Sequence, residues 1–105
     1  MVTILADKDS VSKIQDACRK LAIESNPLDP VNIRFDDDFY VFDYTHAYAV
    51  GIAKRIKTVN PKAKIVMYYP AVRSYVRSEI EKMGFMPFTS VDFFSKLKSI
   101  LQGKM

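Results

Sequence analysis

Short apolar runs alternate along this chain with segments of helical periodicity, and this alternation restricts the folds that are open to it. The runs at residues 2–6, 39–43, 64–69 and 85–88 are each followed by apolar residues that recur every three or four positions. Strands that alternate with helices are typical of a parallel sheet with helices on its faces. The sequence therefore predicts one α/β domain over residues 1–105, a three-layer αβα sandwich around a doubly wound, mostly parallel sheet.

Capping residues indicate where the helices begin and end. Four helices are expected, over residues 10–25, 47–59, 72–83 and 91–101. Asp9 or Ser10 is the expected N-cap of the first helix and Thr89 that of the last, while Gly84 is placed to end the third helix. The expected inner face of the last helix consists of Val91, Phe94, Leu97 and Leu101, with Phe93 as a further candidate.

Residues 31–35 alternate apolar and polar side chains, which is typical of a half-buried strand. Only Asp36, Asp37 and Asp38 separate this stretch from residues 39–43, and a parallel crossover needs about a dozen residues or more. The stretch therefore forms either an antiparallel hairpin or an irregular extended segment beside the sheet. We favour the irregular segment, which leaves four parallel strands, and we interpret the three aspartates as a solvated turn.

Composition limits the class of protein and its compartment. Hydrophobic residues make up 49 % of the chain, and no apolar run approaches the roughly 18 residues that cross a membrane. The first residues lack the basic segment of a signal peptide, and the single cysteine, Cys18, excludes an internal disulfide framework. We therefore expect a cytoplasmic protein with no membrane partner.

The net charge of +4 hides an uneven distribution. Nine acids against five basic residues give −4 in residues 1–45, whereas eleven basic residues against three acids give +8 in residues 46–105. These charges favour a protein partner, with an acidic protein and a second copy of the chain as options. Nucleic acid is the weaker alternative, because the sequence has no nucleic-acid-binding motif. The basic and aromatic candidates for the partner surface are Lys54, Arg55, Arg73, Tyr75 and Arg77.

Carboxylates stand at the ends of two expected strands. Asp7 and Asp9 follow residues 2–6, and Asp43 ends residues 39–43. Parallel strands bring their carboxyl ends to one rim of the sheet, where ligands bind near the point at which strand order reverses. Mg²⁺ prefers oxygen ligands of this kind. The three acids are therefore a candidate Mg²⁺ site, and the site is a phosphoryl acceptor or the remains of one.

With this order of elements and acids, the chain resembles the receiver domain of two-component response regulators, which has a doubly wound, flavodoxin-like fold of the CheY type. The resemblance covers nearly the whole chain. It implies that Asp7 and Asp9 take the place of the acid pair that holds Mg²⁺. It also implies that Asp43 takes the place of the aspartate that accepts the phosphoryl group.

Several departures from the receiver pattern fall at or near positions that handle phosphate. Tyr69 stands where the family has a small Ser or Thr, and Thr89 and Ser90 follow Phe88 where the family has a lysine. Lys8 lies between the two acids, where it would neutralise Asp43 without a metal. The helix before residues 39–43 is also missing. Because phosphoryl transfer needs a cation and a fixed positive group, we expect a pseudo-receiver that acts by protein–protein interaction and has no catalytic activity.

Two alternatives use the acids chemically. A working receiver would bind Mg²⁺ and accept a phosphoryl group on Asp43. Residues 7–11 also resemble the first motif of haloacid-dehalogenase-type phosphatases, which implies Asp7 as nucleophile and Asp9 as acid/base. In receiver-like domains, the docking face would fall on residues 72–83 and 92–101.

Overall fold

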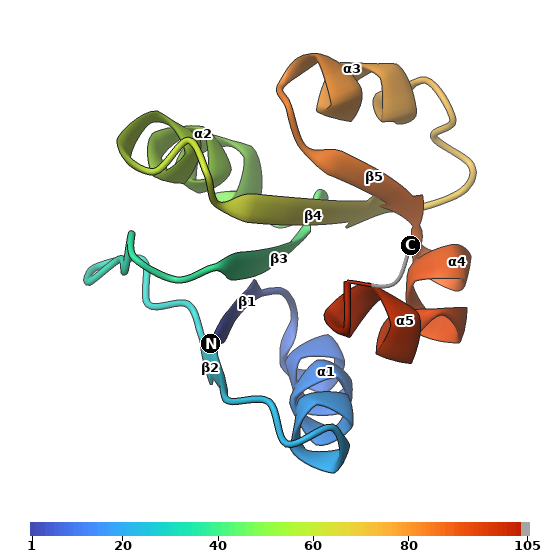
Figure 1. Cartoon of the computed structure of the whole chain (residues 1–105). Helices are drawn as coiled ribbons and strands as arrows, with labels where there is room; N and C mark the ends of the chain where they lie inside the picture. The colour runs from blue at the N-terminus through green and yellow to red at the C-terminus, as the bar shows by residue number, and fades with distance from the viewer. Residues whose placement is uncertain (104–105) are drawn as a thin grey trace.

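All five strands of the sheet run parallel in the computed structural model, which describes residues 1–103 (Figure 1). The strands are β1 (Val2–Leu5), β2 (Ser25–Pro27), β3 (Phe39–Asp43), β4 (Lys64–Tyr69) and β5 (Met86–Thr89). Their order is β2-β1-β3-β4-β5, so the chain winds from β1 first to one side and then to the other. Strand order reverses between β1 and β3. The predicted doubly wound α/β fold is confirmed.

Helices cover both faces of the sheet, as predicted. They are α1 (Lys8–Lys20), α2 (Ala49–Val59), α3 (Val76–Lys82), α4 (Ser90–Ser95) and α5 (Leu97–Leu101). Helices α2 and α3 lie on one face, and α1, α4 and α5 lie on the other (Figure 1). Within residues 1–103, no helix combines the length and apolar character needed to cross a membrane.

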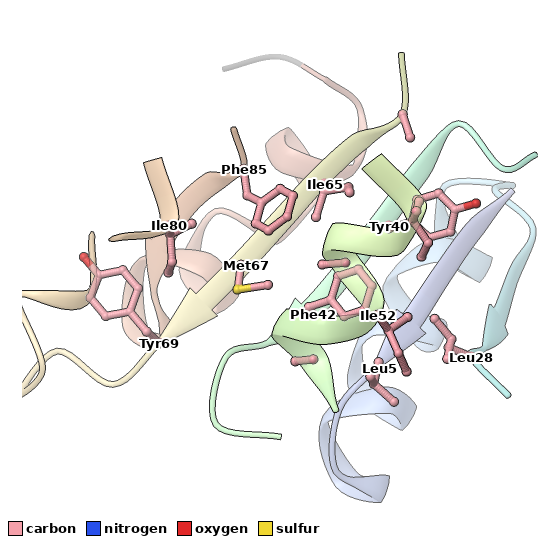
Figure 2. Close-up of a cluster of buried hydrophobic side chains, with 14 of the residues drawn as sticks. Leu5, Leu28, Tyr40, Phe42, Ile52, Ile65, Met67, Tyr69, Ile80 and Phe85 are labelled. Atoms are coloured by element: carbon pink, nitrogen blue, oxygen red, sulfur yellow. The ribbon is translucent and has the colours of Figure 1, made fainter. Parts of the chain in front are cut away.

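Each face of the sheet has its own apolar core, because strand side chains alternate between the faces. Figure 2 shows the core beneath α2 and α3, in which Phe42 and Met67 of neighbouring strands lie in one cluster with Ile80 of α3. On the opposite face, Val41 of β3 belongs to a cluster that includes the fully buried Phe93 of α4. Each such side chain contributes about 1.5–3 kcal/mol through burial. The two cores fix the carboxyl ends of the strands in place.

The second strand lies earlier in the chain than predicted. β2 is formed by Ser25–Pro27, where the sequence predicts the end of a helix and a proline break. It is an edge strand that pairs only with β1, which is a position where proline is tolerated. Residues 31–35 form no strand, and Val31 is 95 % exposed. The irregular segment is therefore confirmed, the antiparallel alternative is wrong, and the sheet has five parallel strands rather than four.

Residues 28–38 cross from β2 to β3 without a helix and are held by the burial of Leu28 in the apolar core and by polar contacts. The Thr3 hydroxyl donates a hydrogen bond to the Asp37 carboxylate, and the Arg34 guanidinium lies 3.6 Å from that carboxylate. The Tyr40 hydroxyl accepts a hydrogen bond from the Asp37 N–H at 3.1 Å and donates one to the Arg34 carbonyl at 2.7 Å. Asp37 is only 4 % exposed. The interpretation of the three aspartates as a solvated turn is therefore wrong for the middle one.

Helix α1 begins and ends earlier than predicted. Its N-cap is Asp7, two residues before Asp9. Its last residue is Lys20, because Ala22 adopts a left-handed backbone with φ of 57°. The N–H of Ile23 then bonds to a carbonyl of the last helical turn at 2.8 Å, which closes the helix end.

Helix α3 begins at Val76 rather than near residue 72. Residues 70–75 form two successive turns instead, in which the Arg73 N–H bonds to the Pro70 carbonyl at 2.9 Å. Gly84 ends this segment with φ of 85°, as predicted.

The last helical segment is divided into α4 and α5 at Lys96. Thr89 caps α4 as predicted, because its hydroxyl accepts a hydrogen bond from the Asp92 N–H at 3.1 Å. The expected inner face is wrong at one position: Val91 is 72 % exposed, and Phe93 takes the buried place.

Candidate functional site

The carboxyl ends of β1, β3 and β4 lie at one rim of the sheet, next to the point where strand order reverses. Asp7 follows β1, Asp43 is the last residue of β3, and Tyr68 stands opposite Asp43 in β4. The charges of Asp43 and Asp7 both act to raise the pKa of the Tyr68 hydroxyl, so all three side chains share one environment. The structure thus brings together two predicted acids and one tyrosine that the sequence analysis missed.

The two acids at this rim already accept hydrogen bonds from their own loops. One oxygen of the half-buried Asp43 carboxylate accepts from the Thr45 N–H at 2.9 Å and from the Thr45 hydroxyl at 2.7 Å. The exposed Asp7 carboxylate accepts from the Ser10 N–H at 3.4 Å, and the Ser10 side chain, together with this N–H, lowers the pKa of Asp7 below its ordinary value. Asp9 is exposed in the first turn of α1, where its negative charge interacts favourably with the helix dipole.

Tyr68 is the least usual group of the site. Its side chain is 3 % exposed, and its hydroxyl is buried. Burial is the main cause that raises its pKa far above the ordinary value. The Ser10 side chain opposes this shift, so Ser10 of α1 belongs to the same rim as Tyr68. The sequence alone does not identify this residue, because the choice depends on the register that pairs Asp43 with Tyr68.

Tyr69, the predicted phosphate-contact residue, lies on the opposite face. It is 3 % exposed and belongs to the core beneath α2 and α3, as Figure 2 shows. Successive strand residues point to opposite faces. The structure therefore places Tyr68, and not Tyr69, beside the two acids.

The other predicted contact residues are used locally. Thr89 caps α4, and Ser90 is the first residue of that helix. Lys8 is exposed, and no carboxylate within residues 1–103 lies within 4.0 Å of its ammonium group. Nor do residues 1–103 contain any group of three His, Cys, Asp or Glu side chains close enough to hold a metal ion. Asp7, Asp9 and Asp43 are thus not arranged as a three-ligand site here.

Aromatic rings surround Tyr68 on the side of α4. Tyr68 stacks on Phe93 with ring centroids 4.7 Å apart, and Phe94 packs edge-on against Tyr68 at 5.4 Å. Phe88 of β5 pairs with Tyr68 in the register of the sheet. This is the place where the receiver resemblance implies a lysine. The site therefore has carboxylates and a phenol but no cation at the end of β5.

The predicted partner residues fall in two places. Arg73 and Tyr75 lie close to Tyr44, the residue after Asp43, since both influence its ionisation. The Tyr44 hydroxyl donates to Glu79 at 3.2 Å, and its pKa is raised first by burial and then by Glu79. Tyr75 is 66 % exposed beside this rim.

The remaining basic candidates are bound elsewhere on the helices. Arg77 pairs with Glu81 at 3.8 Å on α3. The Arg55 guanidinium lies 5.9 Å from the ring centroid of Phe35, a residue of the irregular crossover, and Lys54 is exposed beside it on α2. Lys54 and Arg55 thus lie against the crossover, whereas Arg73 and Tyr75 lie close to Tyr44, the residue after Asp43.

The fold is similar to that of two solved response-regulator structures. The first is described as the BeF3-activated receiver domain of DrrB, with a TM-score of 0.78 and 12 % identity over 98 % of this chain and 94 % of that chain. The second is the response regulator DrrB of Thermotoga maritima, described as an OmpR/PhoB homologue. Its TM-score is 0.69 and its identity 13 %, over 98 % of this chain and 52 % of that chain.

No family model matches the sequence, and no curated protein matches it either. The structural likeness establishes the fold: this chain has the flavodoxin-like architecture of response-regulator receiver domains. The predicted receiver resemblance is confirmed at the level of the fold.

Proposed function

We propose that this domain is a receiver-like module of signal transduction that acts by binding a partner protein, with a phosphoacceptor site that no longer works as a switch. The receiver fold supports the signalling class. The observation that carries the eroded site is Tyr68, whose buried phenol occupies the position beside Asp43 and Asp7.

Charge supplies the physical reason. Transfer of a phosphoryl group to a carboxylate builds negative charge that a metal ion and a fixed cation must offset. At this rim Phe88 is apolar where a lysine would serve, and Lys8 pairs with no carboxylate of residues 1–103. Thr89 has a hydroxyl but no charge, and it is engaged as a cap. Mg²⁺ would have to be held by Asp7, Asp9 and Asp43, which are not gathered into one ligand set.

The competing functions make different demands on the same acids. A working receiver needs Asp43 free to accept a phosphoryl group, whereas Asp43 accepts two hydrogen bonds from Thr45. A phosphatase of the haloacid-dehalogenase type needs Asp7 as a nucleophile, whereas Asp7 caps α1. The partner surface that fits the proposed function best is the rim beside the acids, where Arg73 and Tyr75 are exposed.

A backbone amide NMR titration tests the proposal, first with Mg²⁺ and then with Mg²⁺ and beryllofluoride, a mimic of aspartyl phosphate. We expect no saturable shifts at Asp7, Asp9 or Asp43 at about millimolar Mg²⁺, where metal sites built from few carboxylates bind. Saturable shifts there that spread to residues 72–83 would overturn the eroded site. Asp43→Asn is the matched control, because shifts that persist in this variant do not come from acylphosphate mimicry.

A gain-of-function pair gives the positive arm. Tyr68→Val empties the space beside Asp43, and Phe88→Lys restores a cation at the end of β5. We expect the double variant to show beryllofluoride shifts that the parent lacks. If the folded double variant stays as silent as the parent, Tyr68 and Phe88 are not what disables the site.

A further inference from the structure

A basic groove lies between α1 and the α4–α5 segment, on the face of the sheet opposite α2 and α3. Its volume is about 350 Å³. Four lysines line it, two from α1 and two from the C-terminal segment: Lys13, Lys20, Lys96 and Lys98. The four are exposed, so their charges face solvent around a hollow surface.

The charge of the groove is almost entirely positive. Its one acid is Asp16, which already pairs with Arg19 and Lys20 at 3.2 Å each. Within residues 1–103, no carboxylate lies within 4.0 Å of Lys13 or of the two lysines from the C-terminal segment. Three ammonium groups in one hollow thus have no anionic partner in the described part of the chain.

The floor of the groove is apolar. Ala17, Phe94 and Leu97 line it and are each half-buried. The Lys13 ammonium lies 5.6 Å from the centroid of the Phe94 ring, which holds this cation at the edge of the floor. A ligand that matches this surface has an apolar side chain at its centre and negative charges around it.

We propose that this groove binds an acidic segment of a partner protein, with one apolar side chain of that segment on Phe94 and Leu97 and its carboxylates beside the lysines. The inference rests on the proposed function in one respect only, that the domain acts by binding a protein. It does not depend on whether Asp43 accepts a phosphoryl group.

Two other occupants fit less well. A nucleic-acid backbone is served by an extended basic stripe, whereas this basic surface is a local hollow that includes the Asp16 carboxylate. A second copy of the chain would have to supply an acidic segment. Its densest acidic run is unsuitable, because Asp37 is buried and Asp36 pairs with Arg34 at 3.7 Å.

The test is an amide NMR titration of the whole chain with a short synthetic peptide that has one leucine flanked by glutamates. We expect saturable shifts at Ala17 and over residues 94–99. Lys13→Gln with Lys98→Gln should weaken binding about tenfold, because two partly exposed charge pairs are lost. The matched control, Lys62→Gln with Lys82→Gln, removes the same charge from exposed positions outside the groove and should leave the affinity unchanged.

Three probes separate the possible occupants. A peptide with glutamine in place of glutamate should not bind, and one with serine in place of leucine should bind more weakly. An oligothymidine that gave the same groove shifts at lower concentration would overturn the proposal in favour of nucleic acid. Peptide shifts confined to other surfaces, or equal weakening by both lysine pairs, would overturn it as well.

The two proposals fail separately. Peptide binding in the groove together with a beryllofluoride response at Asp43 would overturn only the eroded site. A silent groove together with a silent Asp43 would overturn only the groove and would leave the exposed rim at Arg73 and Tyr75 as the partner surface.

Discussion

The chain enters strand β3 and leaves it through two crossovers that are held by different interactions. Residues 28–38 approach β3 as an irregular segment that combines the apolar core residue Leu28 with a buried polar contact, in which the Asp37 carboxylate is bonded to Thr3. The crossover from β3 to β4 contains α2, whose Ile52, Ala53 and Ile56 are buried in the apolar core. The helical periodicity of the sequence predicts the second crossover. The first crossover depends on a hydrogen bond between Asp37 and Thr3, which lie 34 residues apart in the chain.

The contrast also concerns tolerance to change. Apolar packing distributes its stabilisation over many contacts. Truncation of one buried side chain leaves a cavity, which lowers the free energy of unfolding. A buried polar contact concentrates its free energy in a few atoms, and removal of one partner leaves the other unsatisfied. The following substitutions test this contrast, first in the two crossovers and then at related positions elsewhere in the fold.

The largest effect is expected in the helical crossover. Ile56→Ala should lower the free energy of unfolding by about 3 kcal/mol, because Ile56 is fully buried and the variant leaves a cavity. Urea denaturation gives this value from the shift of the transition midpoint. Val59→Ala on the same helix is the control, since Val59 is 62 % exposed and its truncation should change stability by less than about 0.5 kcal/mol.

The next effect concerns the polar crossover. Asp37→Ala should destabilise the fold by about 2 kcal/mol, because it leaves the buried Thr3 hydroxyl without its acceptor. Asp36→Ala removes a carboxylate that is 80 % exposed one residue away and should have little effect. If the two variants proved equally stable in urea, Asp37 would not anchor the crossover, and the contrast between the two crossovers would fail.

A third comparison concerns glycine, in the helical crossover and at two positions with a left-handed backbone. Gly51→Ala in α2 should stabilise the fold by about 1 kcal/mol, because an added Cβ meets nothing within 4 Å and glycine weakens a helix. Ala22→Gly, on the way to β2, should stabilise by about 0.5 kcal/mol through relief of the left-handed backbone. Gly84→Ala, at φ of 85°, should instead destabilise in the same thermal or urea assay.

The smallest effect tests a polar contact made in solvent. Asp7→Ala should cost about 0.5 kcal/mol at neutral pH, since Asp7 is an exposed cap with a long hydrogen bond of 3.4 Å. Because the folded-state pKa of Asp7 is lowered, this contribution is present above the ordinary carboxyl pKa of about 4 and is lost as the pH falls through the lowered value. Stability curves of parent and variant should therefore converge in acid, whereas Asp7→Asn, which keeps the cap without the charge, should show no such convergence.

The elements that the sequence predicts correctly are mostly those with a clear hydrophobic periodicity. The strands at residues 39–43 and 64–69 have the predicted bounds, because each is a continuous apolar run between clear breaks. β2 was missed because three residues, Ser25–Pro27, contain no apolar pattern and owe their conformation to pairing with β1. The exposed Val72 was assigned to a helix because periodicity does not distinguish a buried apolar residue from an exposed one.

The sequence predicts the two acids of the candidate site but not Tyr68, which lies beside them. The placement of Asp7 and Asp43 at one rim follows from strand order alone. The receiver resemblance points to Tyr69, the last residue of its strand, whereas the register of the sheet puts Tyr68 opposite Asp43. The prediction of a solvated turn is wrong at Asp37, because the partner that buries it, Thr3, lies far away in the chain.

Tyr68 also sets a limit on the conditions in which the domain can exist. In the folded chain its phenol stays protonated well above the pH at which a free tyrosine ionises, since burial and two carboxylates disfavour the phenolate. Stability that depends on this neutral ring is complete below a pH of about 10 and declines as alkali makes the unfolded, ionised form more favourable. The residue that the proposed function holds responsible for the eroded site thus also determines the upper end of the pH range in which the fold is stable.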